Sequence, residues 1–209
     1  MKFAENLKGW CNQWHEIVYS DEKTFQSFSN GQVLVKRIRG DSENPKYVHF
    51  AVQQEKYRVN VWLAIVFNRP PIVYLAGENF DASAYTRLLD RMMSENFESF
   101  SSTYVLQQDN ASIHTAIVTK RFFYENLIFV LDWPPCSPDL NPVEHVWAII
   151  QKKLAKFLLT NPIKDEEHLF TVIKNLASQI SIEEVNNLID SMPKRCKLVI
   201  ASKGAYTDQ

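Results

Sequence analysis

Glycine and cysteine are both scarce in this chain of 209 residues, which has only five of the first and three of the second. So few glycines, with no glycine- and serine-rich stretch and no internal repeat, exclude a fibrous protein and a flexible linker between domains. The three cysteines are odd in number and far apart, which excludes a disulfide framework and a cysteine-based zinc site. This cysteine usage is typical of a protein in a reducing compartment.

Long apolar runs and an excess of basic charge are also missing. No segment approaches the roughly 20 apolar residues of a membrane span. The first fourteen residues carry charges without the apolar stretch of a signal peptide, so we expect no membrane partner. The formal net charge is −1, which argues against a general nucleic-acid binder. Basic residues do cluster locally, although each cluster is as readily an ordinary solvated face: Lys36, Arg37 and Arg39; Lys56 and Arg58; Lys120 and Arg121; Lys152, Lys153 and Lys156; and Lys194, Arg195 and Lys197.

The composition that remains is that of one folded domain. Hydrophobic residues make up 45% of the chain and aromatic residues 12%, which is enough for a sizeable core at this length. We therefore predict a single domain over residues 1–209, with its core over about 10–157 and a helical C-terminal tail over about 164–200.

Hydrophobic patterning predicts that strands and helices alternate along most of the chain. Strands are predicted within 15–28 and over 33–38, 57–67, 103–108 and 127–132, with short strands over 47–52 and 72–75. Asn30-Gly31 predicts a hairpin turn. Helices are predicted over 2–14, 81–94 and 114–125, from Pro142 onward, and twice within 164–200. This order favours an α/β fold, in which a mixed sheet is flanked by helices.

Three acidic residues stand where such a fold binds ligands. Asp21 lies in the first strand, Asp109 directly follows the strand over 103–108, and Glu144 lies in the first turn of the helix that starts at Pro142. Ligands of open α/β sheets bind at strand ends, and if these two strands are neighbours, Asp21 and Asp109 meet. Carboxylate oxygens suit Mg²⁺, and a pair of such ions can activate an attacking oxygen and stabilise a leaving oxygen at phosphorus.

Each of these acids also has an ordinary structural interpretation. Asp21 can be an exposed strand residue, and Asp109 can belong to a turn with Asn110. Glu144 falls at the third position of its helix, where a carboxylate completes a capping box, and on the residues alone capping is the favoured role. Glu22 should point to the opposite face of the strand from Asp21, so these two should not share a metal ion.

Other polar residues near these acids are interpreted as structural. A lone histidine near a helix start more often forms hydrogen bonds than binds a metal, and this applies to His114 and to His145. Asp132 ends the predicted strand over 127–132, and Asp139 lies in a predicted turn. One apolar stripe at helical spacing is predicted to be core: Val143, Trp147, Ile150 and Leu154.

Three segments resemble the acidic motifs of Tc/mariner DNA transposases. Tyr19-Ser20-Asp21-Glu22 resembles the first motif, and Gln108-Asp109-Asn110-Ala111, with His114, resembles the second. The long stretch WPPCSPDLNPVEHVW over 133–147 resembles the third and is specific. The 34 residues between Asp109 and Glu144 are typical of the Tc-like branch, in which the third acid is glutamate rather than aspartate. The likeness runs from about residue 10 to about residue 157 and includes Tyr85.

This resemblance implies an RNase H-like fold with a mixed five-stranded sheet flanked by helices. It implies that Asp21, Asp109 and Glu144 are catalytic and hold two ions of Mg²⁺ or Mn²⁺. The implied activity is metal-dependent DNA cleavage and strand transfer, in which water frees the transposon end and a 3′-hydroxyl then attacks target DNA, with TA favoured. Transposon ends and target DNA are the expected partners, a homodimer is the expected active complex, and the nucleus is the expected location.

The chain also departs from the family pattern. Leu63 stands where the family usually has glycine, and Ser112 where proline is common. We find no counterpart of the family's N-terminal helix-turn-helix DNA-binding domains, whereas residues 31–58 resemble its protruding loop, which contacts the partner subunit and DNA. A second hypothesis is therefore an inactive or host-adopted remnant that binds nucleic acid or dimerises. The presence of all three acids favours the active enzyme, and the long third motif disfavours a different RNase H-like nuclease.

Overall fold

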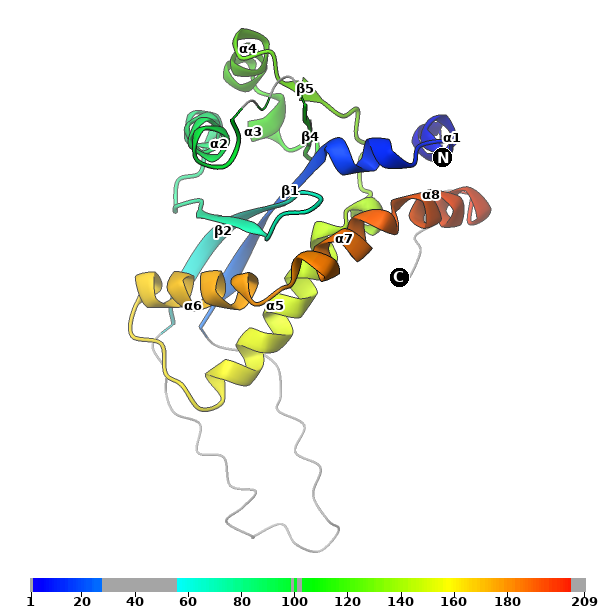
Figure 1. Ribbon diagram of the computed structural model, residues 1–209. Coiled ribbons are helices and arrows are strands. Elements are labelled where there is room, and N and C mark those ends of the chain that lie inside the picture. Colours follow the sequence, from blue (N-terminus) through cyan, green and yellow to red (C-terminus); the bar gives the residue numbers. More distant parts are fainter. Residues whose placement is uncertain (1, 28–55, 99, 101–102, 204–209) are drawn as a thin grey trace, which may run out of the picture.

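The computed structural model describes residues 2–27, 56–98, 100 and 103–203. Its centre is a five-stranded sheet in the order β3-β2-β1-β4-β5 (Figure 1). The strands are β1 (Ile17–Gln26), β2 (Arg58–Ile65), β3 (Ile72–Leu75), β4 (Val105–Gln107) and β5 (Phe129–Val130). Strands β1, β2 and β3 pair antiparallel, whereas β1, β4 and β5 pair parallel. The sheet is therefore mixed, as the sequence predicts.

Helices cover both faces of this sheet. In chain order they are α1 (Lys2–Leu7), the 3₁₀ turn η1 (Asn12–Glu16), α2 (Ala82–Asn96), α3 (Ser112–Thr115), α4 (Ile117–Glu125), the 3₁₀ turn η3 (Pro138–Leu140), α5 (Val143–Leu158), α6 (Glu166–Ser178), α7 (Ile182–Asp190) and α8 (Met192–Ala201). Among the described residues, none of these helices is both long and apolar enough to cross a bilayer.

Three of the predicted helices are divided. The helix predicted over 2–14 is α1 followed by η1, with Gly9, a poor helix former, between them. The helix predicted over 114–125 is broken at Ala116, whose backbone is extended (φ −60°, ψ 151°). The tail holds three helices rather than two, because Ser181 caps α7 with a capping box and Pro193 starts α8. The strands predicted over 33–38 and 47–52, and the Asn30-Gly31 turn, lie outside the described residues.

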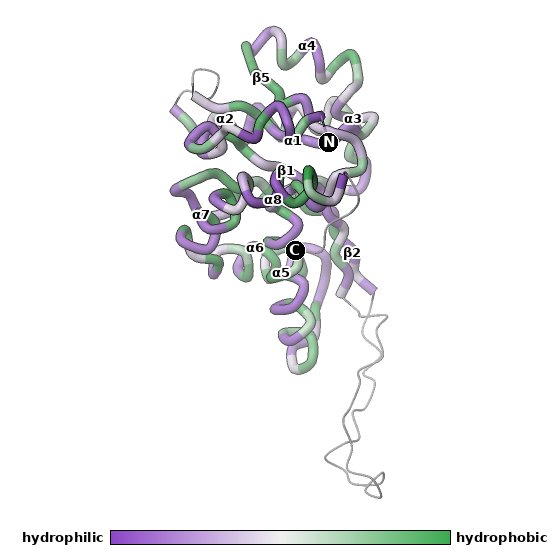
Figure 2. Tube along the Cα trace, turned by 90° about the vertical axis from the view of Figure 1, so that its right-hand side faces the viewer, coloured by the Kyte–Doolittle hydropathy of each residue, from purple (hydrophilic) through white to green (hydrophobic). Residues whose placement is uncertain are grey.

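The alternation of β1 and β2 builds two separate cores, one on each face of the sheet. Ile17, Tyr19 and Leu63 pack on the face covered by α5, α6, α7 and α8. Val18 and Trp62 pack on the opposite face, under α2 and α4. The hydropathy colouring in Figure 2 shows apolar and polar segments alternating along the helices that cover the sheet. Neighbouring residues of one strand thus serve different layers of the molecule.

Helix α5 is held to the sheet by the apolar stripe that the sequence predicts. Val143, Trp147 and Ile150 are fully buried, and Leu154 is buried as well. The register of this stripe fixes which way the first turn of α5 points, and with it the direction of Glu144.

We expect Ile150→Ala to lower the free energy of unfolding by about 2–5 kcal/mol, because the truncation leaves a cavity between α5 and the sheet. Gln151→Ala, on the exposed side of the same helix, is the control and should change it by less than about 0.5 kcal/mol. Urea denaturation of the two variants measures both effects. Equal decreases in the free energy of unfolding of the two variants would contradict the assignment of this stripe as core.

Candidate active site

The parallel pairing of β1 with β4 brings the first two predicted acids to the same cavity. Tyr19 is the partner of Gln107, the last residue of β4, and Asp21 and Asp109 each lie two residues beyond this pair. Ser20 fastens the two strands here, since its hydroxyl donates to the Gln107 carbonyl oxygen at 2.8 Å. The sequence-based hypothesis that these strands are neighbours is therefore confirmed.

Asp21 lies on the α5 face of the sheet in a largely apolar setting. Its strand partner is Leu63, which is fully buried, and the Trp147 indole N–H donates to Asp21 Oδ2 at 3.0 Å. Burial raises the pKa of Asp21 to about 7, and the negative charges of Glu22 and Glu144 add to the effect against the Trp147 hydrogen bond. The surroundings of Asp21 thus disfavour its charged form.

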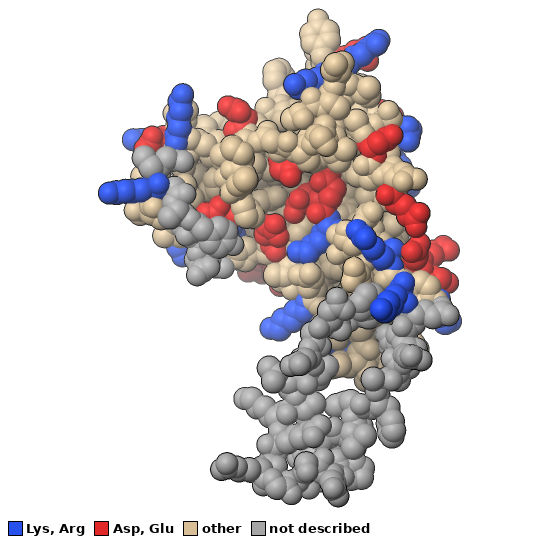
Figure 3. Space-filling model, turned by 180° about the vertical axis from the view of Figure 1, so that it is seen from behind, with Lys and Arg blue, Asp and Glu red and all other residues tan. Residues whose placement is uncertain are grey.

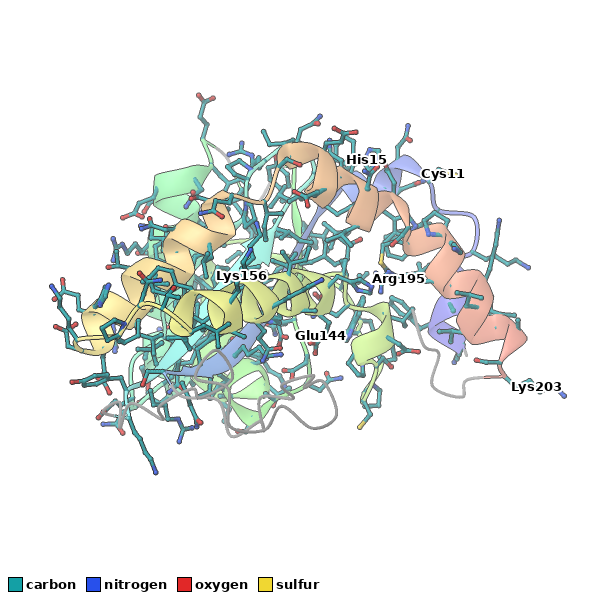
Figure 4. All side chains as sticks on the ribbon, turned by 90° about the horizontal axis from the view of Figure 1, so that it is seen from below. Cys11, His15, Glu144, Lys156, Arg195 and Lys203 are labelled. Carbon is teal, nitrogen blue, oxygen red and sulfur yellow. The ribbon has the colours of Figure 1, made fainter. Side chains whose placement is uncertain are left out.

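Glu144 reaches the same region from the start of α5. Asn141 ties that helix start to β1, because its amide donates to the Ser20 carbonyl at 3.4 Å while its oxygen accepts from Val143 N–H at 3.1 Å. Helix α5 begins at Val143, one residue later than predicted. Figure 4 shows Glu144 at this end of the helix, and its Oε2 lies 3.9 Å from Lys23 Nζ of β1. The side chain therefore approaches the sheet.

Asp109 is held by one of its two carboxylate oxygens. Oδ1 accepts from the Ala111 N–H at 2.9 Å and lies 2.7 Å from His114 Nδ1. The His114 hydrogen bond lowers the pKa of Asp109, against the raising effect of partial burial. The side chain is 60% exposed, and within the described part of the chain Oδ2 has no hydrogen-bond partner. Asp109 is thus ionised and has one oxygen free for a ligand.

All three predicted acids line one cavity of about 410 Å³. The described residues contain no group of three histidine, cysteine or acidic side chains close enough together to hold one metal ion. Figure 3 shows acidic side chains gathered near the middle of one face of the molecule, with basic side chains beside them. The cavity is lined by Asp21, Asp109, Asn110, Ala111, Trp133, Pro134, Pro135, Cys136, Ser137, Pro138, Asn141 and Glu144.

His114 forms hydrogen bonds, as its position near a helix start predicts. Both ring nitrogens face carboxylates, with Nδ1 at Asp109 and Nε2 at 3.1 Å from Glu22 Oε1. Only the protonated ring can donate from both nitrogens. Burial lowers the pKa of His114, but the hydrogen bonds to Asp109 and Glu22 outweigh it and raise the pKa to about 9. His114 is therefore a buried cation between two acids.

The residues interpreted as structural lie beside the site rather than in it. His145 Nδ1 lies 3.1 Å from the Arg195 guanidinium of α8, which also donates to the Asp139 carbonyl at 2.9 Å. These contacts fasten α8 to the segment before α5. Sequence reasoning missed the roles of Trp147, Lys23 and Glu22, because each role depends on a contact across the fold.

We expect Asp21→Asn to stabilise the metal-free domain at pH 8. Because the folded pKa of about 7 lies above the ordinary value of 3.8, the folded state keeps a proton that the unfolded state loses, so stability falls as pH rises between these values. The amide avoids this penalty, which should amount to about 1–4 kcal/mol at pH 8, since one pKa unit is about 1.4 kcal/mol.

Urea denaturation in EDTA from pH 5 to pH 8 measures this effect, and the advantage of Asp21→Asn should shrink toward the acidic end. Asp90→Asn, an exposed acid of α2, is the matched control and should show no such trend. An advantage of Asp21→Asn that does not change with pH would contradict the raised pKa.

The chain is similar to proteins of known activity. Residues 16–169 match the family model described as DDE superfamily endonuclease. The chain is 30% identical over 204 residues to the transposable element Tc1 transposase of Caenorhabditis elegans, covering 97% of this chain and 73% of the relative.

Solved structures share the fold. The Mos1 transposase catalytic domain with raltegravir and Mg superposes with a TM-score of 0.71 at 19% identity, covering 99% of this chain and 92% of that one. The Mos1 mariner paired-end complex with Mn gives a TM-score of 0.77 at 19% identity, with 99% of this chain and 62% of that one covered. The sheet order, the cavity that the three acids share and these likenesses agree. The chain belongs to the DDE superfamily endonucleases and contains a transposase catalytic domain of the Tc1/mariner type.

Proposed function

We propose that this domain cleaves and joins DNA strands with Asp21, Asp109 and Glu144 as the ligands of two divalent ions, Mg²⁺ or Mn²⁺. The observation that carries the proposal is that these three acids, remote in sequence, line one cavity at the end of the β1–β4 pair. Membership of the DDE superfamily endonucleases supports the class of reaction.

The cavity suits hard cations by its donors and its charge. Its acidic ligands offer only oxygen, the donor that Mg²⁺ prefers. Burial, and after it the charges of Glu22 and Glu144, raise the pKa of Asp21, and a divalent ion bound nearby would favour its ionised form. When bound, a pair of ions supplies activation of the attacking oxygen and stabilisation of the leaving oxygen. The Mos1 relatives were solved with Mg and with Mn, which supports the choice of metal.

The protein's own contribution is to fix its carboxylates before DNA arrives. Trp147 orients Asp21 through its indole N–H, and Asn141 joins the start of α5 to β1 so that Glu144 faces the cavity. Lys23, at 3.9 Å from Glu144, and the His114 cation, at 2.7 Å from Asp109, offset part of the negative charge while the carboxylates lack metal. Because no three of these side chains in the described residues lie close enough together to hold one ion, metal binding would draw the carboxylates closer together.

We propose DNA as the partner, with transposon ends and target DNA bound at this face and a homodimer as the active complex. The Mos1 transposase was solved as a paired-end complex with a left transposon end, which supports a DNA partner. Lys152 and Lys156 are exposed on α5, the helix that also carries Glu144, and are suited to contact phosphates along the approach to the cavity. We also propose that the protein acts in the nucleus, where such a DNA substrate would lie.

We expect Asp109→Asn to abolish Mn²⁺-dependent nicking of supercoiled plasmid DNA, because the variant loses an anionic ligand of the proposed ions. The fold should survive, since the amide keeps an oxygen that can accept from the Ala111 N–H. Gel analysis measures nicking with and without EDTA, and circular dichroism measures folding.

Asp132→Asn is the matched control for this experiment, because Asp132 also follows a strand of the sheet but lies outside the cavity. It should nick like the wild type. Nicking that persists in Asp109→Asn, or that needs no divalent ion, would overturn the proposed function.

A further inference from the structure

Asp21 and Glu22 are consecutive in β1 but serve opposite faces of the sheet. Asp21 meets Trp147 of α5 on one face, whereas Glu22 meets His114 of α3 on the other. The opposite facing predicted from strand alternation is thus confirmed, and Glu22 is not among the residues that line the cavity. Glu22 nevertheless reaches the cavity indirectly, because its partner His114 also contacts Asp109.

The His114 ring is held in a fixed position by its surroundings. Its side chain is only 2% exposed, with Glu22 Oε1 at 3.1 Å from one nitrogen and Asp109 Oδ1 at 2.7 Å from the other. The Tyr85 ring lies against it, with ring centroids 4.5 Å apart and an interplanar angle of 48°. Tyr85 is itself fixed, since its hydroxyl donates to Gln108 Oε1 at 2.5 Å. Neither rotation nor displacement of the imidazole is possible without breaking one of these contacts.

This arrangement matters because Asp109 has little else to hold it. Its side chain is 60% exposed and follows the end of β4, where an aspartate would ordinarily sample several rotamers. His114 and the Ala111 N–H both engage Oδ1, which fixes the plane of the carboxylate and leaves Oδ2 for a ligand. The orientation of Asp109 thus depends on a ring whose far side is anchored by Glu22.

We propose that Glu22 and His114 are positioning residues, which hold the Asp109 carboxylate in the orientation that binds metal without coordinating the metal themselves. The inference rests on the proposed function of the cavity and adds two residues to its machinery. Hydrogen-bonded partners of metal ligands typically contribute about 10- to 100-fold to metal affinity.

Two substitutions at Glu22 separate its anchoring role from its charge. Glu22→Ala removes the acceptor, so the ring loses its far anchor. We expect the Kd for Mn²⁺, measured by calorimetry on the DNA-free domain, to rise by about 10- to 100-fold. Glu22→Gln keeps an oxygen that accepts from the His114 N–H, and it should recover most of the lost affinity.

The matched control is Glu125→Ala. Glu125 is also a carboxylate paired with a cation, Arg121, at 2.7 Å, but it lies on α4 away from the cavity. Its removal should leave the Kd for Mn²⁺ unchanged. His114→Ala tests the ring itself and should weaken Mn²⁺ binding at least as much as Glu22→Ala. Because His114 is buried, thermal unfolding in EDTA first establishes that each variant is folded at the temperature used.

The outcomes distinguish this inference from the function on which it rests. If Glu22→Ala unfolds at a lower temperature but binds Mn²⁺ like the Glu125→Ala control, Glu22 is merely structural and the inference is overturned. The same holds if Glu22→Gln binds as weakly as Glu22→Ala, because retained geometry would then be irrelevant. A wild-type domain that binds no Mn²⁺ would instead overturn the proposed function, and this inference with it.

Discussion

The parallel pairing of β1 with β4 is the constraint on which the candidate site depends. It brings Asp21 and Asp109 to the same cavity, and the Ser20–Gln107 hydrogen bond joins the two strands just before these acids. Asn141 joins the start of α5 to the same Ser20 by a hydrogen bond. The position of Glu144, in the first turn of α5, is therefore also fixed relative to β1. Three carboxylates from distant parts of the chain are thereby positioned by a short stretch of sheet.

Such a cluster of acids opposes folding, and the two cores of the domain compensate for it. Asp21 sits against Leu63 and Trp147, in surroundings that disfavour its charge. The pKa of Asp109 is instead lowered, because the buried cation of His114 stabilises its ionised form. The site therefore combines one acid that resists ionisation with one that is fully ionised. In the proposed site, a divalent ion entering the cavity would meet Asp109 already ionised and would shift Asp21 toward its ionised form.

Sequence patterns predicted the sheet, the main helices and the acids, because these depend on local periodicity and on distinctive motifs. Patterns could also show that Asp21 and Glu22 face opposite sides, since strand geometry requires it. They could not show that Trp147, a member of an apolar stripe, also donates a hydrogen bond to Asp21, nor that Glu22 pairs with His114. These contacts join residues 126 and 92 positions apart, and their partners are set by the packing of whole elements.

The opposite facing of Asp21 and Glu22 has a consequence for how this strand can change in evolution. A slip of β1 by one residue, through a single insertion or deletion, would send each acid to the layer now served by the other. Trp147 and His114 would then both lose their partners in one event. A point substitution in this segment removes the contacts of one acid, whereas a change of its length by one residue would disrupt both sides of the candidate site at once.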